Sequence, residues 1–315
     1  MENKGILSTA ISSDGSVRLL MVHTTGIVQY AAERHHPSKT VTAALGRCLS
    51  AVALMGGTLK DPGGSLTLCL RGNGPAGSFT CVSDSEGHVR GCCEEPTAEL
   101  PPNERGKLDV GGVVGREGDL YVVRDYGFGE PYVGLTQLVS GEVAEDVTSY
   151  YAVSEQVPTV CALGVQVGRE GQVEGAGGYL LQLMPGADES LIPILQERVE
   201  VMPAISGLMA RNVSAEQLAD MLFGEIPHEV LESREISYQC NCAREKYRKS
   251  IKSIGIQELK EMADSGEEAE VICRFCGQRH VFGPEELQLM YAERLEELRE
   301  AKRRREAKQQ ENGED

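Results

Sequence analysis

Residues 1–186 alternate short apolar runs with turns rich in glycine, proline and aspartate. The runs lie at residues 16–31, 65–84, 119–127 and 159–168, and each is rich in β-branched and aliphatic side chains. Runs of this kind, bounded by turn residues, are typical of β-strands. Because helical segments do not alternate regularly with them, the pattern predicts an α+β fold rather than a parallel βαβ sheet.

Two segments of this first domain have helical periodicity instead. In residues 40–60 the apolar positions recur every three or four residues and stop at Gly56 and Gly57, which predicts a helix that ends there. Residues 141–156 form the second predicted helix. We therefore expect residues 1–186 to fold as one mixed domain of strands and helices.

The chain changes character in residues 187–235, where helical segments are interrupted by prolines and a glycine. Ser214 and Gln217 have the spacing of a capping box, and Gly224 ends the helix that they begin. We interpret residues 187–235 as a helical linker between two domains. Four of the nine methionines lie in or beside it: Met184, Met202, Met209 and Met221. Core packing is the favoured interpretation of these methionines, and an adaptable binding surface is the alternative.

Residues 236–290 carry two close pairs of cysteines and form a small predicted C-terminal module. We expect a basic helix after the first pair, then a short second helix, then a hairpin over residues 268–282 with the second pair at its turn. A further helix begins at Pro284, because proline suits the first helical turn. Residues 291–315 form a charged tail that is expected to be helical or disordered, and we expect it to fray or be disordered after Arg299.

The acidic composition narrows the classes of partner. The formal net charge is −17, which repels phosphate backbones and argues against general nucleic-acid binding. No signal peptide and no apolar stretch long enough for a membrane span is visible, so we expect a cytoplasmic protein without a membrane partner. In that compartment the ten cysteines are expected to be reduced thiols or metal ligands rather than a disulfide framework.

The strongest chemical signal is a C-x-C followed by a C-x-x-C: Cys240, Cys242, Cys273 and Cys276. Close pairs of cysteines supply the four thiolates of a tetrahedral zinc site. About fifty residues with few large apolar side chains would not hold a core unaided, so zinc would supply the folding energy of the module. Four unrelated thiols are the alternative. His280 could replace one ligand, but we favour a role as an ordinary strand residue.

The helix predicted after Cys242 is basic. Its cationic residues are Arg244, Lys246, Arg248, Lys249 and Lys252. They could offset the charge of −2 that four thiolates leave on one zinc ion. They could also form a solvated helix face, and both interpretations can hold at once.

The same spacing leaves open whether the site is permanent or labile. Thiolate is the form that oxidants attack. Cys273 and Cys276 could close a disulfide across a turn, whereas Cys240 and Cys242 would lie about 6.6 Å apart in extended chain, near the upper limit. The spacing permits a reversible switch without demonstrating it, and most cytosolic sites of four cysteines are structural.

Two glycine-rich segments are not expected to bind phosphate. Gly72, Gly74 and Gly77 have dinucleotide-fingerprint spacing, but a strand rather than a helix follows them. We interpret this segment, and also residues 109–115, as hairpin turns. The remaining cysteines are expected to be buried or neutral thiols: Cys48, Cys69, Cys81, Cys92, Cys93 and Cys161.

Several of these segments are similar to one known family. The pairs "CNC" and "CRFC", the helix "AALGRCLSAVALMGGTLK", and the segments "GDLYVVRDYGFGEPYVGLTQLVSGEVAEDVTSYYAVSEQVPT" and "AGGYLLQLMPGADE" resemble the thirty-three-kilodalton chaperonin, a redox-regulated bacterial heat-shock holdase. The resemblance extends over nearly the whole chain. The charged tail looks longer than that family usually needs.

The resemblance implies a chaperone that is silent while Cys240, Cys242, Cys273 and Cys276 hold one zinc ion. It implies that oxidants release the zinc, that disulfides join Cys240 to Cys242 and Cys273 to Cys276, and that the linker then loosens. It also implies a homodimer that binds unfolding client proteins without ATP and later passes them to ATP-dependent chaperones.

Two other classes of protein remain as alternatives to this chaperone. A zinc-ribbon protein that binds nucleic acid is motivated by the basic residues 244–252 and 302–308, although the acidic composition argues against it. An enzyme that binds nucleotides or exchanges disulfides is motivated by the glycine turn and the C-x-x-C. No nucleophile and base stand out together, so we expect no enzymatic activity.

Overall fold

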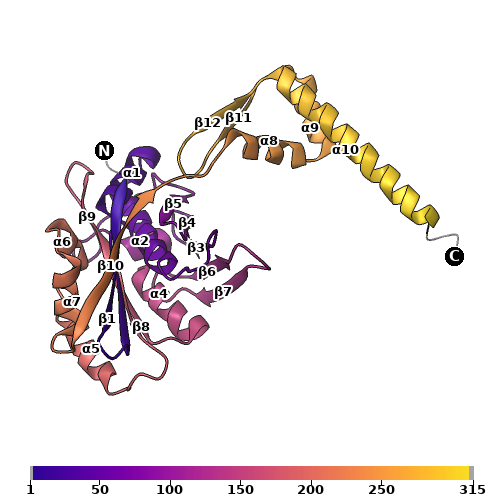
Figure 1. Cartoon of the computed structure of the whole chain (residues 1–315). Helices are drawn as coiled ribbons and strands as arrows, with labels where there is room; N and C mark the ends of the chain where they lie inside the picture. The colour runs from indigo at the N-terminus through magenta and orange to yellow at the C-terminus, as the bar shows by residue number, and fades with distance from the viewer. Residues whose placement is uncertain (1–2, 312–315) are drawn as a thin grey trace. The chain divides into compact units, whose positions relative to one another are not determined.

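The computed structural model describes residues 3–311, and the chain divides into two compact units, residues 1–240 and 241–315. Figure 1 shows the elements of both units along the chain. The units differ in kind: the first is built on a large sheet, and the second on three helices and a short hairpin. Both helices and strands are present in quantity, so the predicted α+β class is confirmed.

The first unit holds ten strands. They are β1 Lys4–Ser12, β2 Val17–His23, β3 Ser65–Gly72, β4 Ser78–Asp84, β5 His88–Cys93, β6 Gly118–Asp125, β7 Tyr132–Gln137, β8 Thr159–Val167, β9 Val173–Leu183 and β10 His228–Tyr238. Its helices are α1 Thr25–His35, α2 Lys39–Gly56, α3 Val110–Val114, α4 Ala144–Tyr150, the π-helical turn η1 Tyr151–Glu155, α5 Leu191–Glu200, α6 Ile205–Ala210 and α7 Ala215–Phe223.

All ten strands form one sheet in the order β7-β6-β3-β4-β5-β10-β1-β2-β9-β8. Neighbours are antiparallel except for β10 and β5, which are parallel. β10 pairs with β1 along its whole length but with β5 only through Ser237 and Tyr238. The last strand in the unit therefore joins the two halves of the sheet.

Opposite faces of the sheet carry two separate apolar cores. α1 and α2 pack on one face, and α2 contacts β4, β5, β8 and β9 and is buried on nearly every side. α5, α6 and α7 cover strands β1, β2, β9 and β10 on the other face, where Leu19, Tyr179 and Leu181 meet Leu208 and Leu222. Figure 1 shows α6 and α7 beside β10 and β1.

The predicted linker is helical only in part. Helices α5, α6 and α7 confirm the expectation for residues 191–223, and Ser214, Gln217 and Gly224 begin and end α7 as predicted. The helical prediction for residues 228–235 is wrong, because they lie in β10. Their pairing partner is β1, more than two hundred residues away in sequence, so local periodicity carries no trace of it.

Two further local predictions are wrong for related reasons. The apolar run at residues 16–31 is a strand only as far as His23, and α1 begins at Thr25. Its β-branched residues favour a strand, but Ile27, Val28 and Ala31 are buried on one helical face. The turn predicted at residues 109–115 is the short helix α3, in which the Asp109 side chain accepts a hydrogen bond from the Gly112 amide at 3.0 Å. The hairpin predicted at residues 65–84 is confirmed as β3 and β4.

The second unit begins immediately after Cys240. Its elements are α8 Arg244–Ser253, α9 Ile256–Asp264, β11 Ala269–Ile272, β12 Arg279–Phe282 and α10 Pro284–Glu311. The two predicted helices, the hairpin and the helix start at Pro284 are confirmed. Its apolar core has six buried residues: Ile251, Leu259, Ala263, Phe282, Leu287 and Met290.

The charged tail is helical as far as the structure describes it. The chain remains helical from Pro284 to Glu311, which agrees with the helical alternative for the tail, whereas the expected fraying or disorder after Arg299 is wrong for the part that the structure describes. Pairs of opposite charge one turn apart support the helix, and Arg304 lies 3.6 Å from Glu300. Residues 312–315 of the predicted tail lie outside the described residues.

The predicted domain limits at residues 186, 235 and 290 remain predictions. The structure divides the chain once, after Cys240, and the helices of the predicted linker pack on the first unit's own sheet. Within residues 3–311, no helix is both long and apolar enough to cross a membrane.

Candidate metal centre

The second cysteine pair is held at the turn of the β11–β12 hairpin. The Cys273 amide donates to the Gln278 carbonyl at 2.9 Å, and the Gly277 amide donates to the Cys273 carbonyl at 2.8 Å. Gly277 has φ 69°, a left-handed conformation that glycine adopts without steric cost. The turn therefore points the Cys273 and Cys276 thiols to the same side, as the C-x-x-C spacing predicts.

The first pair lies between β10, which ends at Tyr238, and α8, which begins at Arg244. The four sulfurs of Cys240, Cys242, Cys273 and Cys276 lie within 4.8 Å of one another. The Cys242 and Cys276 sulfurs are 3.4 Å apart. Residues separated by more than thirty positions are thus brought into one cluster, as the sequence led us to expect.

This cluster has the dimensions of a tetrahedral metal site. Four sulfurs at about 2.3 Å from one zinc ion would lie about 3.8 Å from one another, close to the spacing observed. Cys273 is buried, and the other three cysteines are half-buried. Among the described residues, no other group of three or more cysteine, histidine or acidic side chains converges in this way. The residues therefore fit a metal ion that prefers soft thiolate ligands.

His280 is not a member of the cluster. It lies in β12, and its ring packs against Tyr247 of α8 with ring centroids 4.8 Å apart. The expectation that it is an ordinary strand residue is confirmed.

The basic residues of α8 have partners that the sequence analysis missed. Arg244 binds Glu286 through both guanidinium NH₂ groups at 2.6 and 2.7 Å. One turn later Arg248 binds Glu293 at 2.7 Å, and Lys252 binds Glu293 and Glu297 at 2.8 Å. We call these contacts the α8–α10 ladder.

Three of the five cations therefore pair with α10, whereas Lys246 and Lys249 are exposed, as a solvated helix face predicts. Hydrogen bonds from Arg248 and Lys252 lower the pKa of Glu293. The signal was present in the sequence: Arg244, Arg248 and Lys252 recur every four residues, and Glu286, Glu293 and Glu297 follow one another at seven and four residues, which places them on one side of a helix.

The other cysteines lie in a different environment. Cys48, Cys81, Cys92 and Cys161 are buried, and Cys69 and Cys93 are half-buried. Burial raises the pKa of Cys81 and of Cys161 well above the usual thiol value, and it raises the pKa of Cys93 to about 12. The prediction of buried or neutral thiols is confirmed for Cys48, Cys81, Cys92, Cys93 and Cys161.

Comparisons with known proteins agree with this architecture. A model of the family described as "Hsp33 protein" matches residues 6–283. A 33 kDa chaperonin of Clostridium botulinum (strain Langeland) is 41% identical over 284 residues, which is 90% of this chain and 96% of that protein. The 33 kDa chaperonin of Acetivibrio thermocellus is 42% identical over 278 residues, 88% of this chain and 94% of that protein.

A solved structure has the same fold. The crystal structure of a 33 kDa chaperonin from Thermotoga maritima, described as a heat shock protein 33 homolog, superposes with a TM-score of 0.85 at 35% identity. It covers 94% of this chain and 100% of its own. The family resemblance inferred from the sequence is thereby confirmed: this chain belongs to the Hsp33 family of chaperones.

Proposed function

We propose that the protein is a redox-regulated, ATP-independent holdase whose switch is a zinc site formed by Cys240, Cys242, Cys273 and Cys276. The convergence of four thiols at tetrahedral spacing is the observation that carries the proposal. In the reduced, zinc-bound state the second unit is folded and the chaperone is inactive. We place its action in the cytoplasm, where these thiols stay reduced until an oxidant appears.

The small core of the second unit makes the switch effective. Six buried residues bury too little apolar surface to hold a unit of this size unaided, so the metal supplies much of its folding energy. When the thiolates are oxidised, they no longer bind zinc, and the unit unfolds.

For the oxidised state we propose two disulfides, Cys240 to Cys242 and Cys273 to Cys276. The closest sulfur pair in the folded cluster is Cys242 and Cys276, so spacing alone would favour a different pairing. Once the unit unfolds, however, the cost of loop closure favours partners that are near in sequence. Peptide mapping of the oxidised protein distinguishes these outcomes, and a bond between Cys242 and Cys276 would contradict this pairing.

Unfolding of the second unit would act on the sheet through β10, which ends two residues before Cys240. We propose that residues 187–235 then loosen from the sheet. Their release would uncover the apolar face that includes Leu19, Tyr179 and Leu181, and this face would bind unfolding client proteins. The active form is proposed to be a homodimer, and bound clients would pass to ATP-dependent chaperones when reducing conditions return.

Light scattering of a heat-aggregating client tests the proposal. The fully reduced, zinc-loaded protein is expected not to suppress aggregation, and the peroxide-oxidised protein is expected to suppress it without ATP. Equal suppression by both forms, or by neither, would contradict the redox switch.

The two alternative classes receive no support from the described residues. The α8–α10 ladder neutralises three of the cations that motivated nucleic-acid binding. The segment with dinucleotide-fingerprint spacing is the turn of the β3–β4 hairpin, with no helix N-terminus to hold a phosphate.

A further inference from the structure

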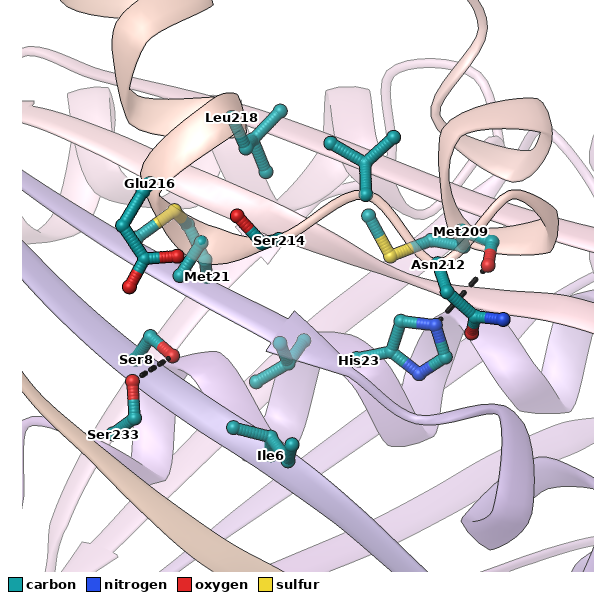
Figure 2. Close-up of a pocket in the computed structure, with 13 residues that line it drawn as sticks. Ile6, Ser8, Met21, His23, Met209, Asn212, Ser214, Glu216, Leu218 and Ser233 are labelled. Carbon is teal, nitrogen blue, oxygen red and sulfur yellow. Dashed lines mark hydrogen bonds between the residues drawn. The ribbon is translucent and has the colours of Figure 1, made fainter.

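A cavity lies between the sheet and the helices that cover its second face. It has a volume of about 340 Å³. Its floor comes from β1, β2 and β10, where Ser8 and Ser233 share a hydrogen bond of 2.7 Å, and its roof comes from α6, α7 and the turn that joins them. Figure 2 shows the side chains of Met21 and Met209 on its walls.

These two methionines are buried but face the cavity. Met21 is 4% exposed and Met209 is 3% exposed, and both belong to the core between the sheet and helices α5–α7. A cavity of this volume admits several water molecules, each of which occupies about 30 Å³ in the liquid. A small neutral oxidant that enters the cavity would therefore lie beside both methionine side chains.

Met209 has little room on its other side. A Cβ atom placed on Gly177 of β9 would lie 2.6 Å from the Met209 sulfur, so the sulfur lies directly against the backbone of the sheet. The Met209 carbonyl also lies 3.1 Å from Nε2 of His23, a contact that joins the end of α6 to β2. An atom added to the sulfur must enter the cavity or push α6 away from the sheet.

We propose that Met21 and Met209 are sites of oxidation to methionine sulfoxide, and that this modification loosens α6 and α7 from the sheet. The proposal deepens the proposed function and rests on it, since it gives the same linker a second oxidant-sensitive contact. It differs from the cysteine switch because thiol reductants reverse the disulfides but not the sulfoxides.

The reaction is an oxygen-atom transfer from a peroxide. The methionine sulfur attacks one peroxide oxygen with a lone pair, an S–O bond forms, and the O–O bond breaks. Sulfur is oxidised by two electrons, hydrogen peroxide is reduced, and the displaced hydroxide takes the remaining proton to leave as water. The product is a polar, chiral group in place of an apolar one, inside a contact that is otherwise formed by side chains such as Leu208 and Leu218.

The chain contains its own controls. Met55 is fully buried in the other core and does not line this cavity, so it should oxidise slowly. Met221 of α7 is 40% exposed and does not line the cavity between sheet and helices. It should oxidise readily without loosening the linker, because its sulfoxide remains in solvent.

The test isolates the sulfoxides from the cysteines. The full-length, zinc-loaded protein is treated with hydrogen peroxide and then incubated with excess thiol reductant and zinc, until zinc content and free thiols return to their starting values. Peptide mass spectrometry then locates each added oxygen, and limited proteolysis measures cleavage within residues 187–227. Wild type is compared with the double variant Met21→Leu, Met209→Leu, which keeps side-chain volume nearly constant, and with Met221→Leu.

After peroxide treatment and thiol reduction, we expect sulfoxide at Met209, Met21 or both. In wild type and in Met221→Leu, cleavage of the linker should be at least about tenfold faster than before peroxide treatment. This increase corresponds to a decrease of about 1.4 kcal/mol in the free energy of local opening. The double variant should show no such increase, and methionine sulfoxide reductases should restore slow cleavage in wild type. The proposal is overturned if both methionines stay unmodified while Met221 is oxidised, or if they are modified without faster cleavage. Failure of the cysteine switch would appear separately, as absence of client protection by the disulfide form before reduction.

Discussion

The two units of this chain are stabilised in different ways. The first unit has two apolar cores on opposite faces of a ten-stranded sheet, and α2 is buried on nearly every side. The second unit has six buried apolar residues, three of the four clustered thiols and a set of partly exposed ion pairs. Hydrophobic burial is the main source of stability in the first unit, whereas folding of the second unit is proposed to depend on the chemical state of the clustered sulfurs.

The clustered cysteines and the other cysteines of the chain also differ in how readily they react. Burial raises the pKa of Cys81, Cys93 and Cys161 in the first unit, so all three have little thiolate. Cys81 and Cys161 are buried, so reagents are also excluded from them. Three of the four cysteines in the cluster are half-buried, within reach of a reagent. In the proposed switch, the clustered thiols can thus react with an oxidant while Cys81, Cys93 and Cys161 stay reduced.

Loss of the four-cysteine cluster should have the largest effect on the folding of the second unit. The double variant Cys240→Ser, Cys273→Ser should lose metal binding, and with it the apparent 10–16 kcal/mol or so that a structural zinc contributes. The second unit should then be unfolded by NMR while the first keeps its signals. The half-buried pair Cys69→Ser, Cys93→Ser is the matched control and should retain full metal content. Unchanged metal content in the first variant would remove these cysteines as ligands.

The second largest effect should be a difference in the rate of thiol alkylation between the clustered cysteines and Cys93. The pKa of Cys93 is raised from 9.0 to about 12, so at neutral pH its thiolate population is about a thousandfold lower than that of an ordinary cysteine. Alkylation of the chelator-treated protein, followed by peptide mass spectrometry, should label Cys242 and Cys276 long before Cys93. Labelling of Cys93 should keep rising as the pH passes 9.0, the ordinary value. Equal rates for Cys93 and Cys242 would contradict the contrast between the units.

The α8–α10 ladder should contribute least to the stability of the second unit. Glu293→Gln removes the shared carboxylate of Arg248 and Lys252, and we expect a loss of less than about 1 kcal/mol, since the pair is largely solvated. The midpoint of urea-induced metal release should fall slightly, and the difference should vanish in about 1 M salt. Glu296→Gln, an exposed position on the same helix, is the control.

The pH dependence of the ladder follows from the lowered pKa of Glu293. The stabilisation is present above the ordinary value of 4.5 and is lost as the pH falls through the lower folded value, because protonation removes the charge. The effect of Glu293→Gln should therefore shrink under acidic conditions. An effect that is independent of both salt and pH would mean that the glutamate acts through packing instead.

Local sequence alone determined much of this protein. The spacing of Cys240, Cys242, Cys273 and Cys276 predicted the cluster, since close pairs of thiols at turns have few other arrangements. The helix at residues 39–56, the cap at Ser214 and the hairpin around the C-x-x-C follow from contacts within a few residues. Such contacts are fixed by periodicity, capping and turn chemistry, which the sequence displays directly.

Tertiary structure alone decided the features that depend on distant partners. Residues 228–235 look helical by themselves, but pairing with β1 makes them part of the strand that joins the halves of the sheet. Glu293 is an unremarkable acid until α10 lies against α8. Met21 and Met209 share a cavity although nearly two hundred residues separate them. In each case the deciding energy comes from a contact between segments far apart in the chain, which no local pattern encodes.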